Sequence, residues 1–380
     1  MLSTNRERAI ATLVREGALH RADLARRLSV SRTTASNVVQ GLRSEGLLDV
    51  DGPGLKAKLR VSDTLGVLVS VVFQLTRTTV AVGRIDGEPL AVHETAHAVS
   101  DHGSTRLEAS IPLVQQLLAG LEVPLVRATH VAVNTQVDVR TGEVLGAGAS
   151  AMWAGTNPRH AFASALSAPV RMENTARLLG LVEHLAGTGG PSRNLLYLHL
   201  AHGVTLGQVL EGTIVQGSHG GAGEIGHMSI DRQGPTCSCA NRGCLMQYVG
   251  EIAIAARAQE LLGDVATVDY MVKQAQQGDR ACQELIAKIG VDIGDAMAGV
   301  SNLMDPDVIV LGGKLAAAGE LLTAPVRRTI HDHALPLATR KLTVATAKAT
   351  EDPYAAAIAG LRPPITDPEL LETIVRAALA

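Results

Sequence analysis

Aromatic residues are scarce in this sequence of 380 residues, which contains two Phe, four Tyr and one Trp. Proteins that bind single-stranded nucleic acid stack its bases on aromatic rings, so the scarcity argues against that function. The core must consist mainly of Leu, Val, Ile and Ala, because hydrophobic residues still make up 46% of the chain.

Long apolar runs are also missing from the sequence. No stretch approaches the roughly 18–20 apolar residues that cross a membrane, and the polar residues 3–8 are unlike the start of a signal peptide. We therefore expect a cytoplasmic protein with no membrane partner. The length of the chain suggests two or three domains.

Charged residues are few, at 19%, but they are unevenly distributed. Residues 1–60 carry eleven Lys and Arg against six Asp and Glu, a net charge of +5, whereas the remainder carries −8. A basic head on an acidic body suggests an anionic partner for the head alone, although small domains often carry a few net charges by chance.

Cysteine is rare as well, yet Cys237, Cys239 and Cys244 fall within eight residues. In a reducing compartment such a group indicates metal ligands rather than disulfides. Together with His227, one imidazole and three thiolates suit tetrahedral zinc and leave no open position for water, so we predict one structural zinc per chain. Metal-free cysteines and a catalytic zinc are the alternatives. Cys282 lies in a helical pattern and is expected in the core.

Residues 1–62 have the pattern of a winged helix-turn-helix domain. The predicted elements are helices over 5–16, 21–28 and 32–46, followed by a β-hairpin over 47–61. Ser31 is a natural N-cap for the third helix, while Gly17 and Gly46 end the first and third. The alternative is a small helical interaction module with a solvated polar face.

The third helix begins with polar residues, as a DNA-recognition helix does. Such a helix enters the major groove with its N-terminal end, where short or forked side chains reach base edges and phosphates. The basic residues of the hairpin, including Arg60, suit phosphates or the minor groove. The predicted DNA contacts are Ser31, Arg32, Thr33, Thr34, Ser36, Asn37, Lys56 and Lys58.

Residues 63–380 alternate between strand and helix patterns, which indicates an α/β body. The predicted strands include 67–72, 79–82, 131–133, 195–200 and 308–311, and the predicted helices include 104–120, 160–167, 174–186, 250–262 and 283–303. The Gly- and Ser-containing stretch 187–192 suggests a turn between two lobes.

Several motifs together resemble the ROK family of repressors, open reading frames and kinases. They are GAGEIGH at 221–227, CSCANRGC at 237–244, WAGTNP at 153–158 and VIVLGG at 308–313. With the N-terminal head, the chain is most similar to the repressor branch of the family. The resemblance implies an actin-like, ribonuclease-H-like body with two lobes, a homodimer or tetramer, and an inducing sugar between the lobes.

The resemblance also shows which parts of the kinase machinery are missing. Kinase members have an Asp-x-Gly-Gly-Thr phosphate loop. The aligned stretch of this chain begins with Val72 and contains neither the aspartate nor the glycines. The second phosphate loop, at 201–207, is only half retained. The catalytic Asn-Asp pair falls on Asn174 and Thr175, and threonine cannot act as a base near neutral pH. We therefore expect no enzyme activity; a sugar kinase with a regulatory head is the rival interpretation.

The sugar site of the family is retained only in part. Asn174, Glu224 and His227 match family sugar contacts, and His227 could bind zinc through one nitrogen and a ligand through the other. Thr175 and Met246 replace carboxylates, which weakens the case for an unmodified hexose. Asn174 and Glu224 could instead support the zinc loop and lobe packing. The sequence thus predicts a repressor that binds double-stranded operator DNA and responds to a sugar or sugar derivative, with a ligand-independent regulator as the alternative.

Overall fold

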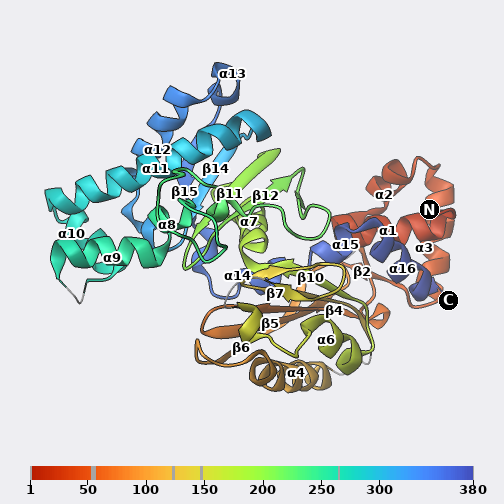
Figure 1. The fold of residues 1–380 in the computed structure, drawn as a ribbon. Helices are drawn as coiled ribbons and strands as arrows, with labels where there is room; N and C mark the ends of the chain where they lie inside the picture. The colour runs from red at the N-terminus through yellow and green to blue at the C-terminus, as the bar shows by residue number, and fades with distance from the viewer. Residues whose placement is uncertain (1, 53–56, 122–124, 146–148, 264–265, 380) are drawn as a thin grey trace. The chain divides into compact units, whose positions relative to one another are not determined.

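The computed structural model describes residues 2–52, 57–121, 125–145, 149–263 and 266–379, and the chain forms two compact units (Figure 1). The first unit comprises Met1–Val144, Ala149–Glu173 and Ala356–Ala380. The second comprises Leu145–Gly148 and Asn174–Ala355. Both are α/β, as the sequence predicts. In the described part of the chain, no helix is both long and apolar enough to cross a membrane.

The first unit begins with three helices and a small sheet. The helices are α1 (Asn5–Glu16), α2 (Arg21–Leu28) and α3 (Arg32–Ser44), and the strands β1 (Leu19–His20), β2 (Leu48–Asp51) and β3 (Lys58–Val61) pair in the order β1-β3-β2. Leu13, Leu24 and Leu42, one from each helix, are completely buried. These elements agree with the predicted head, except that β1 was not predicted.

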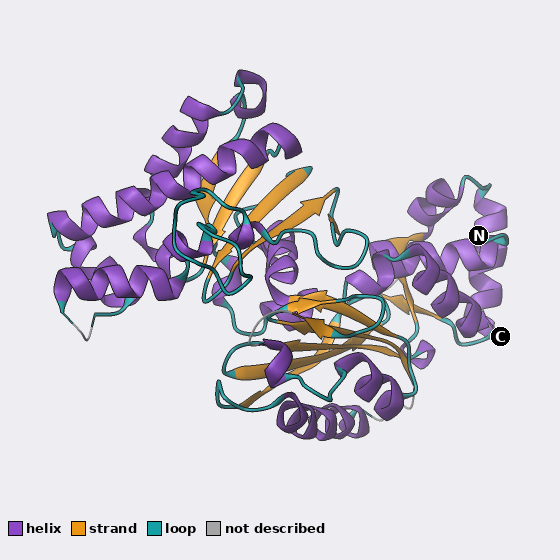
Figure 2. Cartoon of the chain, in the orientation of Figure 1, coloured by secondary structure: helices purple, strands orange, loops and turns teal. Residues whose placement is uncertain are grey.

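A five-stranded sheet follows, in the order β10-β7-β4-β5-β6. Its strands are β4 (Val67–Phe73), β5 (Arg77–Arg84), β6 (Pro89–Ala96), β7 (Val126–Val133) and β10 (Val170–Asn174). Strands β4, β5 and β6 form an antiparallel meander, and β7 runs parallel to β4. The helices α4 (Gly103–Gly120) and α6 (Pro158–Leu166) cover one face (Figure 2).

The core under these helices contains both Phe and the single Trp of the sequence. Phe73 makes an edge-on contact with Trp153 at 5.2 Å between ring centroids, and Phe162 lies 6.4 Å from Phe73. All three are buried among Val, Leu and Ile side chains. The shorter elements nearby are β8 (Gln136–Val137), β9 (Val144–Leu145) and α5 (Ala149–Met152).

The C-terminal segment returns to the first unit. After α14 (Ala355–Ala359) come α15 (Pro363–Thr366) and α16 (Pro368–Leu379), and both contact α1 and β7. The apolar face of α16 buries Leu371, Ile374 and Val375. The last helix therefore packs between the N-terminal head and the first sheet.

The second unit contains a sheet in the order β13-β12-β11-β14-β15. Its strands are β11 (Asn194–Leu200), β12 (Val204–Leu210), β13 (Thr213–Ile214), β14 (Val308–Gly312) and β15 (Thr343–Thr346). The first three are antiparallel, while β14 and β15 run parallel to β11. The two sheets share one topology, a meander whose first strand also pairs with a later parallel strand. This repetition confirms the predicted two-lobed body.

Helices cover the second sheet on both faces. Leu196 and Leu198 pack with α11 (Arg280–Met304) and α12 (Glu320–His333), whereas Tyr197 faces α7 (Thr175–Ala186). The remaining elements are α8 (Met246–Val249), α9 (Glu251–Leu262), α10 (Val268–Gln276), α13 (Pro336–Thr339) and the short 3-10 helices η2 (Asp63–Leu65), η3 (Ile225–His227), η4 (Lys314–Ala318) and η5 (Ala349–Glu351).

One boundary prediction is wrong. The stretch 187–192, predicted as a turn between lobes, connects α7 to β11 inside the second unit. Backbone N–H groups of Gly187 and Gly189 both donate to the carbonyl of Glu183, so these glycines end a helix. The chain instead passes between the units near residues 144–149, 173–174 and 355–356.

Candidate functional site

Four side chains in the second unit form a compact group of metal-ligand type. They are His227, Cys237, Cys239 and Cys244, whose potential ligand atoms all lie within 4.8 Å of one another. Sγ of Cys237 is 3.6 Å from Nδ1 of His227, and Sγ of Cys239 is 3.6 Å from Sγ of Cys244. The structure thus brings together the complete predicted ligand set.

These distances fit zinc. Tetrahedral zinc with Zn–S near 2.3 Å and Zn–N near 2.0–2.1 Å separates its ligand atoms by about 3.5–3.8 Å. A disulfide would instead need about 2.05 Å between sulfurs, and the cysteines are free thiols. The imidazole faces the group with Nδ1, which leaves Nε2 as the nitrogen on its far side.

Backbone hydrogen bonds fold the chain around this group. The N–H of Cys237 donates to the carbonyl of Asn241 at 2.8 Å, and Ser229 and Cys244 form an antiparallel bridge. Gly243 adopts φ +62°, and a Cβ there would lie 1.6 Å from the carbonyl oxygen of Asp231. Glycine is therefore required immediately before the last cysteine.

The thiols differ in acidity. Burial alone would raise the pKa of Cys237, but the backbone N–H of Cys239 and the side chain of His227 lower it to about 6. Burial raises the pKa of Cys244, and the neighbouring Cys239 and Cys237 raise it further, to about 12. The Cys237 thiolate therefore forms easily without a metal, while the Cys244 thiolate needs a cation nearby.

A buried arginine holds the glycine-rich loop that precedes His227. Nη1 of Arg177, on α7, donates to the carbonyl oxygens of Gly220 at 2.7 Å and Ala222 at 2.9 Å, and the whole side chain is inaccessible to solvent. Gly223, at φ +92°, presses against Leu206, where a Cβ would lie 1.8 Å from the carbonyl oxygen. Sequence reasoning missed Arg177, because helical spacing does not distinguish a buried arginine from a surface one.

The three predicted sugar contacts all belong to the second unit, around α7 and η3. Asn174 is buried and caps α7, since its Oδ1 accepts a hydrogen bond from the N–H of Ala176 at 2.8 Å. Glu224 is half-buried and directly precedes η3, which ends at His227. Asn174 therefore has a structural role in addition to any contact with a ligand.

Six of the eight predicted DNA contacts lie at or near the N-terminal end of α3. Ser31 caps this helix, because its Oγ accepts a hydrogen bond from the N–H of Thr34 at 3.0 Å. Arg32, Thr33 and Asn37 are exposed, and among the described residues no acidic side chain pairs with Arg32. Thr34 and Ser36 are half-buried and offer less surface. Exposed Gln40 extends this polar face, although it was not predicted.

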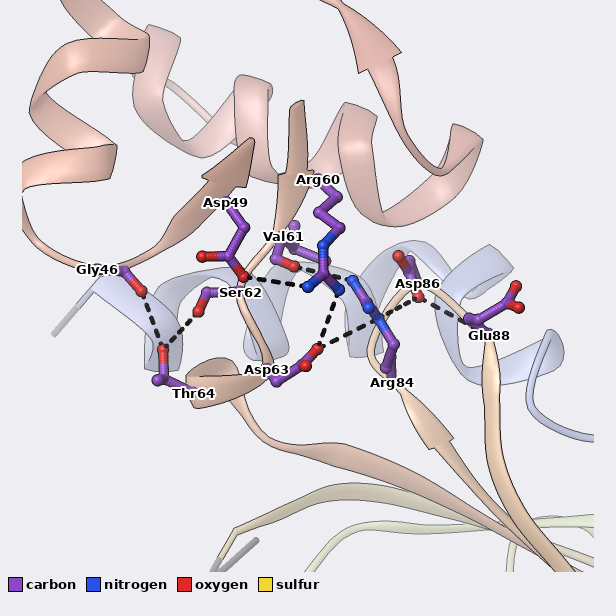
Figure 3. Close-up of polar contacts among 10 residues, drawn as sticks. All are labelled: Gly46, Asp49, Arg60, Val61, Ser62, Asp63, Thr64, Arg84, Asp86 and Glu88. Carbon is purple, nitrogen blue, oxygen red and sulfur yellow. Dashed lines mark hydrogen bonds and ion pairs between the residues drawn. The ribbon is translucent and has the colours of Figure 1, made fainter. Parts of the chain in front are cut away.

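Contrary to what its sequence suggests, not every basic side chain of the hairpin is free to contact DNA. Lys58 is exposed at the start of β3, and Lys56 lies outside the described residues. The guanidinium of Arg60 lies 3.7 Å from the carboxylate of Asp49 and 3.5 Å from that of Asp63 (Figure 3). Arg60, expected to suit phosphates or the minor groove, therefore already pairs with two carboxylates of the hairpin and the residues after it.

Val72 and Thr175, the two positions predicted to lack kinase groups, are both buried. Val72 lies inside β4, paired with Thr79 and Ala132, and is inaccessible to solvent. Thr175 is the first residue of α7 and is only 5% exposed. The stretch 201–207, predicted as a second phosphate loop, forms the turn from β11 to β12 and the first part of β12.

Comparison with known proteins gives consistent relationships. The xylose repressor of Caldicellulosiruptor bescii is 22% identical over 349 residues, which cover 86% of this chain and 87% of that protein. A glucokinase of Halalkalibacterium halodurans is 31% identical over 183 residues, 44% of this chain and 56% of that enzyme. The crystal structure of a ROK family transcriptional regulator, a homolog of the E. coli MLC protein, superimposes with a TM-score of 0.80 over 98% of both chains at 23% identity.

The sequence pattern of one protein family also matches this chain directly. The ROK family pattern matches residues 75–359, which include the glycine-rich loop and the cysteine group. Because this match spans well over half of the sequence, the chain belongs to the ROK family.

Proposed function

We propose that the chain is a cytoplasmic transcriptional repressor, with a winged helix-turn-helix over 1–62 that binds operator DNA and a ligand-responsive body over 63–380. The observation that carries this proposal is α3, a capped helix with exposed Arg32, Thr33 and Asn37 at its start. This head precedes the family-matched region, and a relative aligned over most of its length is a xylose repressor.

The proposed DNA contacts are Ser31, Arg32, Thr33, Thr34, Ser36 and Asn37 on α3, with Lys56 and Lys58 on the hairpin. Side chains at the start of α3 would contact base edges, and the lysines would contact phosphates. As a homodimer, the protein would bind two half-sites one or more helical turns apart. A tetramer would carry two such pairs of heads.

The four ligands of the metal group would hold one structural zinc. A bound zinc closes its shell with protein ligands, so it supplies folding energy and activates no water. His227 would use Nδ1 for the metal and present Nε2 to a ligand hydroxyl. The rigid position of this imidazole would then follow from the fold of the cysteine loop.

Asn174, Glu224 and His227 are the proposed contacts of a carbohydrate-type effector. An amide, a carboxylate and an imidazole each form directional hydrogen bonds with hydroxyl groups. An effector alters DNA binding only if it prefers one conformation of the body over another. A regulator that ignores small molecules remains the alternative, and calorimetry against sugars, sugar phosphates and oligosaccharides distinguishes the two.

A sugar kinase is the second candidate, because part of the chain is 31% identical to a glucokinase. The buried Val72 offers no oxygen for magnesium, and Thr175 provides no base for a sugar hydroxyl. We therefore expect no turnover in a coupled ATPase assay with a panel of sugars. Robust turnover that is lost on mutating Asn174 would favour the kinase.

The decisive experiment is selection of duplexes from a randomised pool by the purified full-length protein. We expect enrichment of a pseudo-palindromic sequence. The affinity of the protein for this duplex should fall as the salt concentration rises, because contacts with phosphates release bound counterions. Failure to enrich any duplex would reject the proposed function, and enrichment of single strands would contradict the assigned binding mode.

A further inference from the structure

The head joins the first sheet through a short connection that ionic side chains surround. Residues 62–66 link β3 to β4, and η2 occupies most of this stretch. Figure 3 shows charged side chains from the hairpin, from this linker and from the turn between β5 and β6 converging on one place. All of them belong to the first unit.

One carboxylate is shared between the head and the sheet. Oδ1 of Asp63 lies 3.5 Å from Nη1 of Arg60 on β3 and 3.3 Å from Nε of Arg84 on β5. Arg60 also approaches Asp49 of β2 at 3.7 Å. Asp63 therefore connects the hairpin of the head to a strand of the sheet.

Arg84 makes further contacts on both sides of the connection. Its Nη2 donates to the carbonyl oxygen of Val61 on β3 at 3.1 Å, and its Nε lies 3.5 Å from Asp86. The Arg84 side chain is only 12% exposed, whereas the Asp63 side chain is 52% exposed, so water reaches the carboxylate more readily than the guanidinium. The C-terminal segment is close to the same turn, because a Cβ at Gly87 would lie 3.3 Å from Cδ of Arg362. Burial raises the pKa of Asp86, and backbone hydrogen bonds and the nearby arginines oppose this rise.

Two hydrogen bonds tie the first half of the linker to the head. Oγ1 of Thr64 donates to the carbonyl oxygen of Gly46, at the end of α3, and the N–H of Ser62 donates to that of Leu47, both at 3.0 Å. Changes at this junction thus reach the C-terminal end of the proposed recognition helix directly. Ion pairs as exposed as those of Asp63 are individually weak. Removing one of them should therefore change the orientation of the head without unfolding it.

We infer that Asp63 is a positioning residue, which sets the orientation of the head on the first sheet by holding Arg60 and Arg84 at one carboxylate. The inference rests on the proposed function, because this orientation matters only if α3 binds DNA. In a dimer it fixes the spacing between two recognition helices. It therefore determines which separation of half-sites the protein accepts.

The test compares Asp63→Asn and Asp63→Glu with Glu94→Gln, a control that removes a carboxylate from the same sheet, where Glu94 pairs with Arg77. Hydrogen exchange is measured without DNA. Binding is measured with two probes, the duplex selected by the wild type and a duplex with only one of its half-sites. The thermal midpoint of each variant reports its folding.

In Asp63→Asn we expect amides of 58–66 and 84–88 to exchange roughly three- to tenfold faster, with α1 unchanged. The two-half-site duplex should bind several-fold more weakly, the single half-site should bind equally well, and Asp63→Glu should restore both properties. Unchanged exchange, or an equal loss for both duplexes, overturns the inference. A wild type that binds no duplex rejects the proposed function, and exchange alone then decides whether Asp63 holds the junction.

Discussion

Sγ of Cys237 lies 3.6 Å from Nδ1 of His227, although the two residues are ten positions apart in the sequence. This contact closes a loop that ends with Cys244 and leads directly into α8 and the core of the second unit. A zinc bound here would therefore connect the loop that carries Glu224 to the helical layer.

Replacement of Cys239 by Ser should remove the metal. Serine is a poor zinc ligand, and the loss should weaken binding by more than the roughly 10–100-fold that follows removal of an outer-shell partner. We expect well below one zinc per chain and a lower thermal midpoint. Cys282→Ser is the matched control, because Cys282 is buried in α11 away from the group. One full equivalent of tightly held zinc in Cys239→Ser would refute the ligand set.

Replacement of Arg177 by Met should destabilise the glycine-rich loop. Methionine fills similar space but leaves the carbonyls of Gly220 and Ala222 without their donor, which costs about 1–3 kcal/mol. Urea unfolding followed by circular dichroism measures the loss. Arg193→Met is the control, since Arg193 is 78% exposed and pairs with Glu211 on the surface. Equal destabilisation by the two variants would show that the buried hydrogen bonds contribute little.

Acid should destabilise the first unit through His130. Burial lowers the pKa of this histidine to about 4, and the carboxylate of Glu173 only partly opposes the shift. The unfolded chain, with an imidazole pKa near 6.5, binds the proton more readily. Above pH 6.5 His130 is neutral in both states, so it imposes no pH-dependent cost on folding. As the pH falls from 6.5 to about 4, the free energy of unfolding should decrease by at most about 1.4 kcal/mol per pH unit.

His130→Gln should flatten this pH dependence. The fluorescence of Trp153, the single tryptophan, reports unfolding of the same unit, so urea midpoints can be compared between pH 7 and 5. His93→Gln, on the exposed face of β6, should keep the slope of the wild type. Parallel curves for His130→Gln and the wild type would contradict the assignment.

Local signals explain why the head and the metal group could be predicted from the sequence. Ser31 starts a helix through its side-chain hydroxyl, and Gly17 ends one because it has no side chain. Both signals act over a few neighbouring positions, so a short stretch of sequence is enough to predict these ends. The metal ligands belong to residue types that are rare and chemically specific, and they fall within one short stretch. In both cases the determining contacts are close in sequence.

Contacts between distant residues could not be predicted in this way. Arg177 binds carbonyls more than forty positions away, and Asp63 pairs with Arg84, twenty-one positions further along the chain. The return of α16 to α1 joins the two ends of the chain. Such pairings depend on tertiary packing, which a single sequence does not reveal.

Replacement of Arg32 by Ala should weaken DNA binding without unfolding the head. Arg32 is the first residue of α3, exposed and without an acidic partner among the described residues, so its loss disturbs no native contact there. If it forms a bidentate contact with guanine, affinity should fall by about 1–3 kcal/mol and specificity at that base should relax. If it binds a phosphate, all duplexes should weaken alike and the salt dependence should become shallower by about one unit. Fluorescence anisotropy over a salt series separates the two cases, with Arg77→Ala on β5 as a control for the lost charge. Unchanged affinity for the selected duplex would remove Arg32 from the DNA contacts.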